Sequence, residues 1–341
     1  MVIIRPVKPA DLDDLVALAH QETYGLTSLP RDARLLRTRI LESLYAFQKL
    51  VQKPGGELYM FVMEDLTTGH VIGTSCIISK VGGFQPFYSY RIDVSVHESK
   101  TLGIRKEIPT LHLINEHSGP SEIGGLLLAP EYRKHGNGRL LSLFRFLFMA
   151  EYPERVEPVV IAEMRGVLDP KGNSAFWDAL GRHFFDMDYP SADLLSAMDK
   201  KFIADLMPTS AIYIPLLPKE AQQVIGEVHE QTRPALRLLQ EEGFQYTKMV
   251  DIFEAGPVVQ CRVEDIRTVR ESRKATVAEI RDLGDEKPSH IVCTLGEEFR
   301  CFMGGVTIDE DGNAHATFRE VERVDLQPGD TIRFAPLRPS D

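Results

Sequence analysis

The spacing of apolar side chains changes from one segment of the chain to the next, and each spacing predicts an element. Asp11–Gln21, Ala33–Val51, Asn137–Glu151 and Ser174–Phe184 carry apolar residues at helical spacing, with Asp11 expected as an N-cap. Strands are predicted where apolar runs or alternation are rich in β-formers, at Val2–Val7, Glu57–Asp65, Val71–Val81, Phe87–His97, Ser121–Pro130 and Glu157–Gly166. This order predicts a mixed sheet with helices on its faces, an α/β layered domain.

The second half of the chain changes character twice. A connecting region, Met187–Pro218, is followed by Lys219–Phe253, which has the pattern of two helices and a strand. From about Gln260 the helical periodicity fades, and short β-like runs are separated by turns such as "DEDGN" at Asp309–Asn313. We therefore expect a small β-rich domain at the end of the chain.

Composition narrows the class of protein. The 341 residues suggest about two domains, and 43% hydrophobic with 26% charged residues is ordinary for a soluble globular protein. A net charge of −11 argues against nucleic acid or an anionic membrane as partner. We expect a cytoplasmic protein, because the first residues lack a signal-peptide pattern and no apolar stretch reaches the about 18 residues of a membrane span.

The four cysteines do not form a metal or disulfide pattern. Cys76, Cys261, Cys293 and Cys301 are scattered and include no CxxC pair. The sequence therefore predicts reduced, mostly buried thiols and no metal site.

One basic stretch stands out in this acidic chain. After an apolar strand, the segment "RKHGNGR" at Arg133–Arg139 has the form R-x-x-G-x-G and opens a helix. Glycines allow backbone N–H groups to approach a ligand, and a helix N-terminus favours anions. The segment is neither a P-loop nor the dinucleotide fingerprint. It predicts a pyrophosphate site, although a solvated strand-to-helix turn would give a similar pattern.

These residues also carry a resemblance. "RKHGNG" after a strand resembles the R/Q-x-x-G-x-G/A signature with which the GNAT acyltransferase superfamily binds the pyrophosphate of coenzyme A. The stretches "GLTSLP", "VVIAEMRGVLDPKGNSAFWDALGRHFFDMD" and "QQVIGEVHEQTRPALRLLQEEGF" are similar to the arginine N-succinyltransferase family, and the similarity extends to about Arg273. In some bacteria this family occurs as two similar subunits acting on arginine and ornithine; the resemblance implies the alpha subunit.

The resemblance implies a function and a fold. The expected reaction transfers succinyl from succinyl-CoA to the α-amino group of L-arginine, with L-ornithine as a further acceptor. Succinyl-CoA would be a co-substrate, with no permanently bound cofactor, in a homo- or hetero-oligomer. The expected domains are a GNAT-like acyl-CoA-binding domain (1–200), a second GNAT-like segment with the catalytic histidine (201–260) and the small β-rich domain (261–341).

The resemblance also implies roles for particular residues. In GNAT folds the strand before the loop splays from its neighbour, and its free backbone groups bond the pantetheine. His229 falls at the position of the catalytic proton donor. The implied cofactor-binding residues are Leu126, Leu127 and Leu128 on the strand and Arg133, Lys134, His135, Gly136, Asn137, Gly138 and Arg139 in the loop.

Nitrogen acylation requires a neutral amine, a stabilised oxyanion and a protonated leaving thiolate, and histidine suits the proton transfer. From the residues alone, His229 has the pattern of a solvated helix-end histidine, and His117 is an alternative that precedes the cofactor strand. Covalent catalysis by Cys76 is a competing chemistry, but its apparent strand context favours burial. Direct attack of the amine on the thioester is the simpler mechanism.

Substrate contacts are less defined by the sequence. Arg91 and Arg165 are candidates for the succinyl carboxylate, and Glu122 and Glu163 for the guanidinium of arginine. Thr27 and Ser28 lie in an early loop that usually borders the acceptor site. Each residue has an ordinary structural interpretation as well. Two other functions stay open: a GNAT acyltransferase with another acyl-CoA or amine, and a non-catalytic CoA-binding partner subunit.

Overall fold

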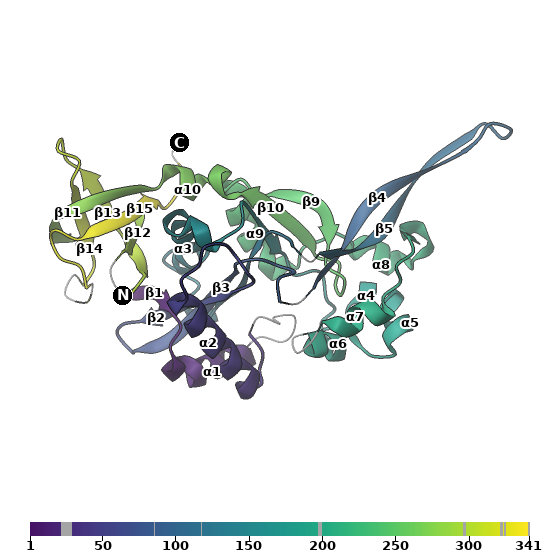
Figure 1. Ribbon diagram of the computed structural model, residues 1–341, viewed down its shortest axis with the longest axis horizontal. Helices are drawn as coiled ribbons and strands as arrows, with labels where there is room; N and C mark the ends of the chain where they lie inside the picture. Colours follow the sequence, from purple (N-terminus) through teal and green to yellow (C-terminus); the bar gives the residue numbers. More distant parts are fainter. Residues whose placement is uncertain are drawn as a thin grey trace.

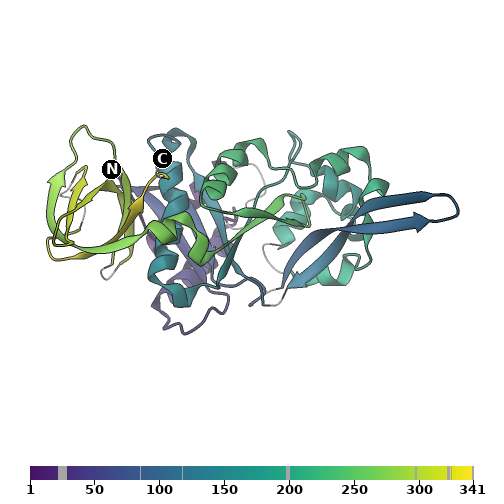
Figure 2. The same cartoon turned by 90° about the horizontal axis from the view of Figure 1, so that it is seen from above.

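A mixed β-sheet with helices on both faces runs through the molecule, with a small barrel at one end and a two-stranded arm at the other (Figure 1). Seen from above, the barrel, the sheet, a helical lobe and the arm follow one another along the long axis (Figure 2). The computed structural model describes residues 1–21, 29–84, 86–116, 118–196, 200–295, 298–320, 323 and 325–339. The predicted α/β layering is confirmed.

The strands have the following bounds: β1 Val2–Pro6, β2 Leu58–Asp65, β3 His70–Ile78, β4 Phe87–Ser99, β5 Ile104–Glu116, β6 Ser121–Leu128, β7 Val159–Glu163, β8 Ile212–Tyr213, β9 Gln245–Val250, β10 Pro257–Arg262, β11 Arg273–Asp282, β12 His290–Thr294, β13 Arg300–Ile308, β14 Ala314–Phe318 and β15 Thr331–Pro336. The helices are α1 Leu12–Gln21, α2 Ala33–Gln48, α3 Asn137–Glu151, α4 Ala175–Ala179, α5 Arg182–Phe185, α6 Tyr189–Ser196, α7 Lys201–Leu206, α8 Lys219–Val224, α9 Arg233–Glu241 and α10 Arg267–Glu271.

The central sheet has the order β1-β2-β3-β6-β7-β10-β9-β4-β5-β8. Its strands pair antiparallel except for β6 and β7, which are parallel. That parallel pairing covers only two residue pairs, Ser121 with Val160 and Glu122 with Ile161. Beyond Glu122, no strand of the described residues pairs with the β7-facing edge of β6, and this opening positions the site described below.

The alternation of β2 explains how the sheet acquires a helix layer on each face. Tyr59 and Phe61 share one hydrophobic cluster with α3, whereas Met60 and Val62 pack with α1 and α2. Successive side chains of a strand point to opposite faces, so one apolar strand serves both layers. Helix α3 is buried almost throughout because the end barrel, α9 and α10 cover its other side.

A second core lies under the helical lobe. Trp177 is fully buried between Phe185 and Phe253, and its Nε1 donates to the carbonyl oxygen of Met187 at 3.0 Å. This tryptophan joins α4 and α5 to the region around β9, so that the lobe packs against the far half of the sheet.

The C-terminal strands close a small barrel, in which β12, β13, β14, β11 and β15 pair in a ring. A buried ion pair precedes the barrel: Arg267 of α10 contacts Glu242, which follows α9, at 2.6 Å. Closure removes free strand edges, which otherwise promote aggregation. The predicted β-rich tail thus becomes a barrel that begins at β11, while β10, across the predicted boundary at residue 261, belongs to the central sheet.

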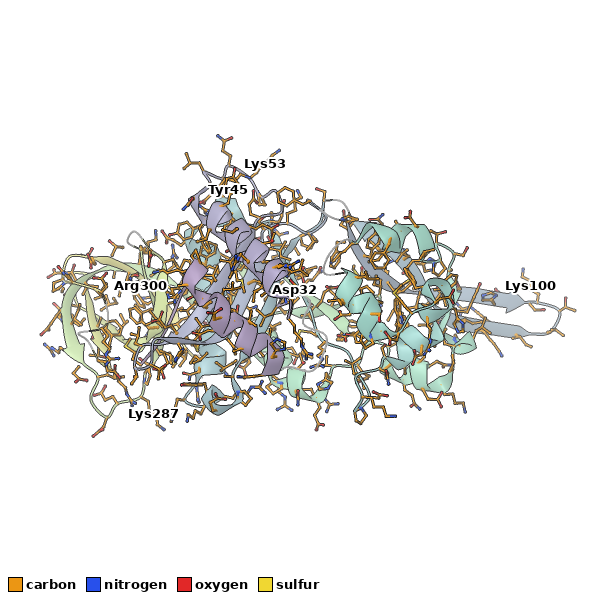
Figure 3. The ribbon with its side chains drawn as sticks, turned by 90° about the horizontal axis from the view of Figure 1, so that it is seen from below. Asp32, Tyr45, Lys53, Lys100, Lys287 and Arg300 are labelled. Carbon is orange, nitrogen blue, oxygen red and sulfur yellow. The ribbon has the colours of Figure 1, made fainter. Side chains whose placement is uncertain are left out.

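Strands β4 and β5 extend beyond the body as a two-stranded arm (Figure 1). Figure 3 places Lys100 at its tip, while Lys287 and Arg300 lie on the barrel, Asp32 at the start of α2, and Tyr45 and Lys53 near its other end. Val94 and Val96 of the outer half of the arm are exposed. This part of the ribbon therefore does not contribute to the core of the chain.

Some predicted elements differ from the structure. Strand β5 was not predicted as a separate element, because its charged outer half hides the apolar pattern. The single helix expected at Ser174–Phe184 is two short helices, because the backbone leaves helical geometry at Leu180, with φ −130° and ψ −75°. At the next residue, Gly181, any Cβ would meet the ring of Trp177. Asp11 does not cap α1; its carboxylate accepts bonds from Arg5 and from the N–H of Lys8.

Candidate active site

A cavity of about 1340 Å³ opens where β6 and β7 separate. It is bounded by α2, β3 and β6, by the basic loop and the part of α3 up to Arg145, and by β7 with segments from residues 189–254. The cavity therefore brings together segments that are far apart in the sequence. Its size suits a ligand as large as an acyl-CoA arm together with a second small molecule.

The wall formed by β6 is distorted in a specific way. Two residues of β6, Gly125 and Leu126, lie opposite one residue of β3, Ser75, so β6 contains a bulge. Gly125 has a φ of +59°, which an amino acid with a side chain adopts only at a cost. Leu126, Leu127 and Leu128, the residues expected to contact the pantetheine, all line the cavity. The bulge and the missing β7 pairing leave backbone groups of β6 facing the cavity.

The basic loop leads from β6 into α3 through two left-handed residues, His135 (φ 55°) and Gly136 (φ 84°). Arg133, Lys134, His135, Gly136 and Gly138 line the cavity. A Cβ on Gly138 would meet no atom of the described residues within 4 Å, so protein packing does not require glycine there. The first N–H groups of an α-helix have no acceptor within the helix, and together with the basic side chains they give the loop the features that can bind an anion.

Two predicted loop residues have structural partners instead. Asn137 is buried and donates to the carbonyl oxygen of Tyr132, and Arg139 forms an ion pair with Glu241 at 2.8 Å. Neither belongs to the residues that line the cavity. Consecutive helix residues point in directions about 100° apart, so only part of a helix start can face one ligand.

His229 is not one of the residues that line the cavity, but it lies next to three that do, Arg165, Gln231 and Thr232. Its backbone N–H donates to the carbonyl oxygen of Arg165, at 2.9 Å, directly after β7. Its Nδ1 accepts from the N–H of Gln231 at 3.2 Å, and Gln231 and Thr232 line the cavity. Because Nδ1 acts as an acceptor, the neutral imidazole carries its proton on Nε2. The hydrogen bond from its neighbour thus fixes the orientation of the ring.

Four carboxyl groups meet in the part of the cavity near β7: Glu122, Glu163, Asp251 and Glu254, which we call the acidic cluster. Burial raises the pKa of each, and for Glu163 the charges of Glu122 and Asp251 raise it further. The pKa of Glu254 rises to about 8. The charge of Lys200 opposes this rise for Glu122, Glu163 and Asp251, and the charge of Arg165 opposes it for Glu254.

The members of the acidic cluster differ in their bonding. Glu254 accepts from the N–H of Gly166 and from the hydroxyl of Tyr189, each at 2.8 Å. In contrast, Oε1 of Glu163 is buried and has no hydrogen-bond partner among the described residues. A buried acceptor without a donor is costly, so this oxygen suits a ligand that supplies one.

Cys76 is buried in the wall of the cavity, as the sequence predicted. Burial raises the pKa of its thiol to about 11. The thiol therefore stays protonated near neutral pH, which disfavours covalent catalysis by this residue.

The predicted substrate residues divide into three groups. Glu163 and Arg165 line the cavity, whereas Arg91 does not: it lies near the base of the arm, half-exposed, and pairs with Asp93 at 2.9 Å. Thr27 and Ser28, like the alternative His117, lie outside the described residues. Sequence reasoning missed Asp251, Glu254, Arg39 and Arg145, because no motif surrounds them.

The described residues contain neither a metal-binding group nor a membrane-spanning helix. Among the described residues, no group of three or more His, Cys, Asp or Glu side chains is arranged to hold a metal ion. Within the same residues, none of the helices has the length and apolar character to cross a membrane.

Comparison with known proteins identifies the class first, an acyltransferase. The family model that matches residues 2–268 is described as "Arginine N-succinyltransferase beta subunit". The arginine N-succinyltransferase of Enterobacter sp. (strain 638) is 42% identical over 343 residues, covering 100% of this chain and 99% of that protein. That of Salmonella schwarzengrund (strain CVM19633) is 41% identical over 340 residues, covering 99% of this chain and 98% of that protein.

A solved structure agrees. Subunit AI of arginine/ornithine succinyltransferase from Pseudomonas aeruginosa superposes with a TM-score of 0.89 at 32% identity, covering 99% of both chains. The chain belongs to the arginine N-succinyltransferase family. The family model names a beta subunit and the solved structure a subunit AI, so the expectation of an alpha subunit stays a prediction.

The pKa of Glu254 generates a prediction for stability. The folded carboxyl holds its proton up to about pH 8, whereas its reference pKa is 4.5. Since the folded state then binds more protons than the unfolded state, the free energy of unfolding should fall as pH rises across this interval. Glu254→Gln should remove this loss. Between pH 5 and pH 8, the free energy of unfolding of the variant should rise relative to that of the wild type by at least about 1.4 kcal/mol, the value of one pKa unit.

Urea denaturation at pH 5 and pH 8 measures this difference. The exposed Glu220→Gln is the control and should follow the wild type at both values. Parallel pH dependence of wild type and Glu254→Gln would show that Glu254 is ionised in the fold.

Proposed function

We propose that the chain transfers the succinyl group of succinyl-CoA to the α-amino group of L-arginine, giving N2-succinylarginine and CoA. The observation that carries this proposal is the cavity itself, in which strand β6, separated from β7, the basic loop at Arg133–Arg139 and the acidic cluster meet. The strand suits the pantetheine of CoA, the loop suits its pyrophosphate, and the acidic cluster suits the guanidinium of arginine. We also take the core around β6, β7 and α3 to be GNAT-like, with residues 201–260 as a second GNAT-like segment.

The donor would lie along β6. The pyrophosphate binds at the loop, where Arg133 and Lys134 add charge to the N–H groups that open α3. Leu126–Leu128 contact the pantetheine, whose amides bond the backbone of β6 on the side that β7 leaves free. The thioester then reaches the bulge at Gly125, where a backbone N–H supports the oxyanion.

The acceptor would lie at β7. The guanidinium of arginine enters the acidic cluster and donates to Glu163, whose Oε1 lacks another partner among the described residues. A cation there also favours ionisation of carboxyls whose pKa is raised by burial. Arg165, on the loop after the same strand, is then close to the α-carboxylate or the succinyl chain.

The chemical step is direct attack. The neutral α-amine forms a C–N bond with the thioester carbon, and the C–S bond breaks. The nitrogen loses one proton and the sulfur gains one. His229 relays this proton from the nitrogen to the sulfur, so that the amide and the free thiol form together. The hydrogen bond from Gln231 to Nδ1 supports this assignment because it fixes the orientation of the ring.

The other expectations stay predictions: use of ornithine, a cytoplasmic location, and assembly as a homo- or hetero-oligomer. A different acyl-CoA or amine, and a non-catalytic CoA-binding role, are the competing functions. Oε1 of Glu163, which is buried and has no hydrogen-bond partner among the residues that the structure describes, favours a cationic acceptor over a neutral one.

Thiol release tests the function directly. The purified chain mixed with succinyl-CoA and L-arginine should release CoA thiol and form succinylarginine, measured with a thiol reagent and mass spectrometry. Omission of arginine is the control and should abolish release. Absence of release with arginine and with ornithine, each with and without a second similar subunit, would refute the proposal.

Replacing Glu163 should weaken recognition of the acceptor. We expect Glu163→Gln to raise the KM for arginine about 10- to 100-fold, because a charge-assisted hydrogen bond is lost. In citrulline a neutral urea group replaces the guanidinium, so kcat/KM for citrulline should fall little in this variant. The arginine-to-citrulline ratio of kcat/KM should therefore decrease. The exposed Glu131→Gln, outside this cavity, is the matched control. An unchanged ratio would remove Glu163 from recognition.

Replacing His229 should act on turnover. His229→Ala is expected to lower kcat about 10²- to 10⁴-fold, the usual contribution of general acid–base catalysis, with little change in the KM of either substrate. A circular dichroism spectrum and an unfolding curve check that the fold persists. If the variant keeps full turnover, His229 does not take part in the reaction.

A further inference from the structure

Arg145 is a buried cation on α3. Its side chain is 2% exposed, and it lines the cavity. The guanidinium donates to the carbonyl oxygen of Ser142 at 2.9 Å and to its hydroxyl at 3.1 Å. It forms no salt bridge with any described residue. A buried charge without a counter-charge destabilises a protein, so an anionic ligand would offset an existing cost.

A second arginine approaches the same region from the opposite helix. Arg39 of α2 is partly buried, also lines the cavity, and forms no salt bridge with a described residue. Burial is the main influence on both guanidinium groups and lowers their pKa, to about 10 for Arg145. For the Cys76 thiol, burial and then Glu122 raise the pKa, and the charges of Arg39 and Arg145 oppose them. Both arginines therefore act on one point in the wall.

Cys76 lies near the end of β6 at which the thioester is proposed to bind, which we call the acyl end. It pairs with Gly124, directly before the bulge, while the basic loop follows the other end of the strand. Along α3, Gly138, Leu141, Ser142 and Arg145 line the cavity. This is the i, i+3, i+4, i+7 spacing of one helix face. Arg145 lies about 10 Å along the axis from Gly138, so this face runs from the pyrophosphate end towards the acyl end.

We propose that Arg145, together with Arg39, binds the free carboxylate of the succinyl group and thereby selects succinyl-CoA over neutral acyl-CoAs. Guanidinium groups form strong charge-assisted bonds with a carboxylate. The two arginines then bind the carboxylate of the acyl group, and the acidic cluster binds the guanidinium of the acceptor. The inference rests on the proposed function for the identity of the acyl group. It assigns the succinyl carboxylate to Arg145 and Arg39 in place of Arg91 and Arg165, the two candidates from the sequence.

The test compares succinyl-CoA with butyryl-CoA, which has the same chain length without a carboxylate. Calorimetric binding to the whole chain should show an Arg145→Met variant losing about 10²-fold in affinity for succinyl-CoA. Its affinity for butyryl-CoA should stay within about twofold. Arg145→Lys should recover part of the preference. Arg37→Met, an exposed arginine on the same helix as Arg39, is the control and should behave as the wild type.

The same variants separate a binding role from a structural one. Because Met removes an uncompensated buried charge, the unfolding midpoint of Arg145→Met without ligand should stay equal or rise. Equal losses with both acyl-CoAs would overturn the inference, since Arg145 would then serve the CoA phosphates or the fold. A raised KM for arginine with an unchanged succinyl-to-butyryl ratio would also overturn it. Binding is measured without turnover, so a failure of the proposed reaction is recognised separately, by the absence of thiol release.

Discussion

The incomplete pairing of β6 with β7 is the constraint on which the site depends. Parallel strands that stay paired bury their backbone groups in a ladder, but here the ladder ends at Glu122. The backbone groups beyond that point must be satisfied by something else, because a buried unpaired group is costly. The bulge at Gly125 adds to the separation. The opening therefore creates both the volume of the cavity and a row of backbone donors and acceptors along it.

The rest of the structure keeps this opening in place. Helix α3 packs on β2 and β3 through a cluster of aromatic residues, including Phe61 and Phe148. On the other side of the opening, β10 pairs with β7 through five residues. Arg267 and Glu242 then join α9 to α10, next to the barrel. Both walls of the cavity share one hydrophobic cluster, which includes Phe148 of α3, Val160 of β7 and Val259 of β10, so their common packing fixes how the walls lie relative to each other.

The charged groups of the cavity are divided as the two proposed substrates require. Arg133, Lys134 and Arg145 line it along the basic loop and α3, while carboxyl groups gather beside β7. The raised pKa values of the carboxyl groups result from their burial and from the charges of neighbouring carboxyl groups, an arrangement that is unfavourable without a ligand. A functional site often carries such a cost, because polar groups organised in advance need not reorganise during the reaction.

The sequence by itself determined the elements whose signals are local: helix α3 has the predicted bounds, and the basic loop before it lies at its start. Period and capping act within a few residues, so they can be read from the chain. Tertiary structure decided which loop residues face the cavity, turning Asn137 and Arg139 away, and it placed Arg91 outside. It also assembled Glu163, Asp251 and Glu254 with Arg145, because strand order and helix packing join segments that no local pattern connects.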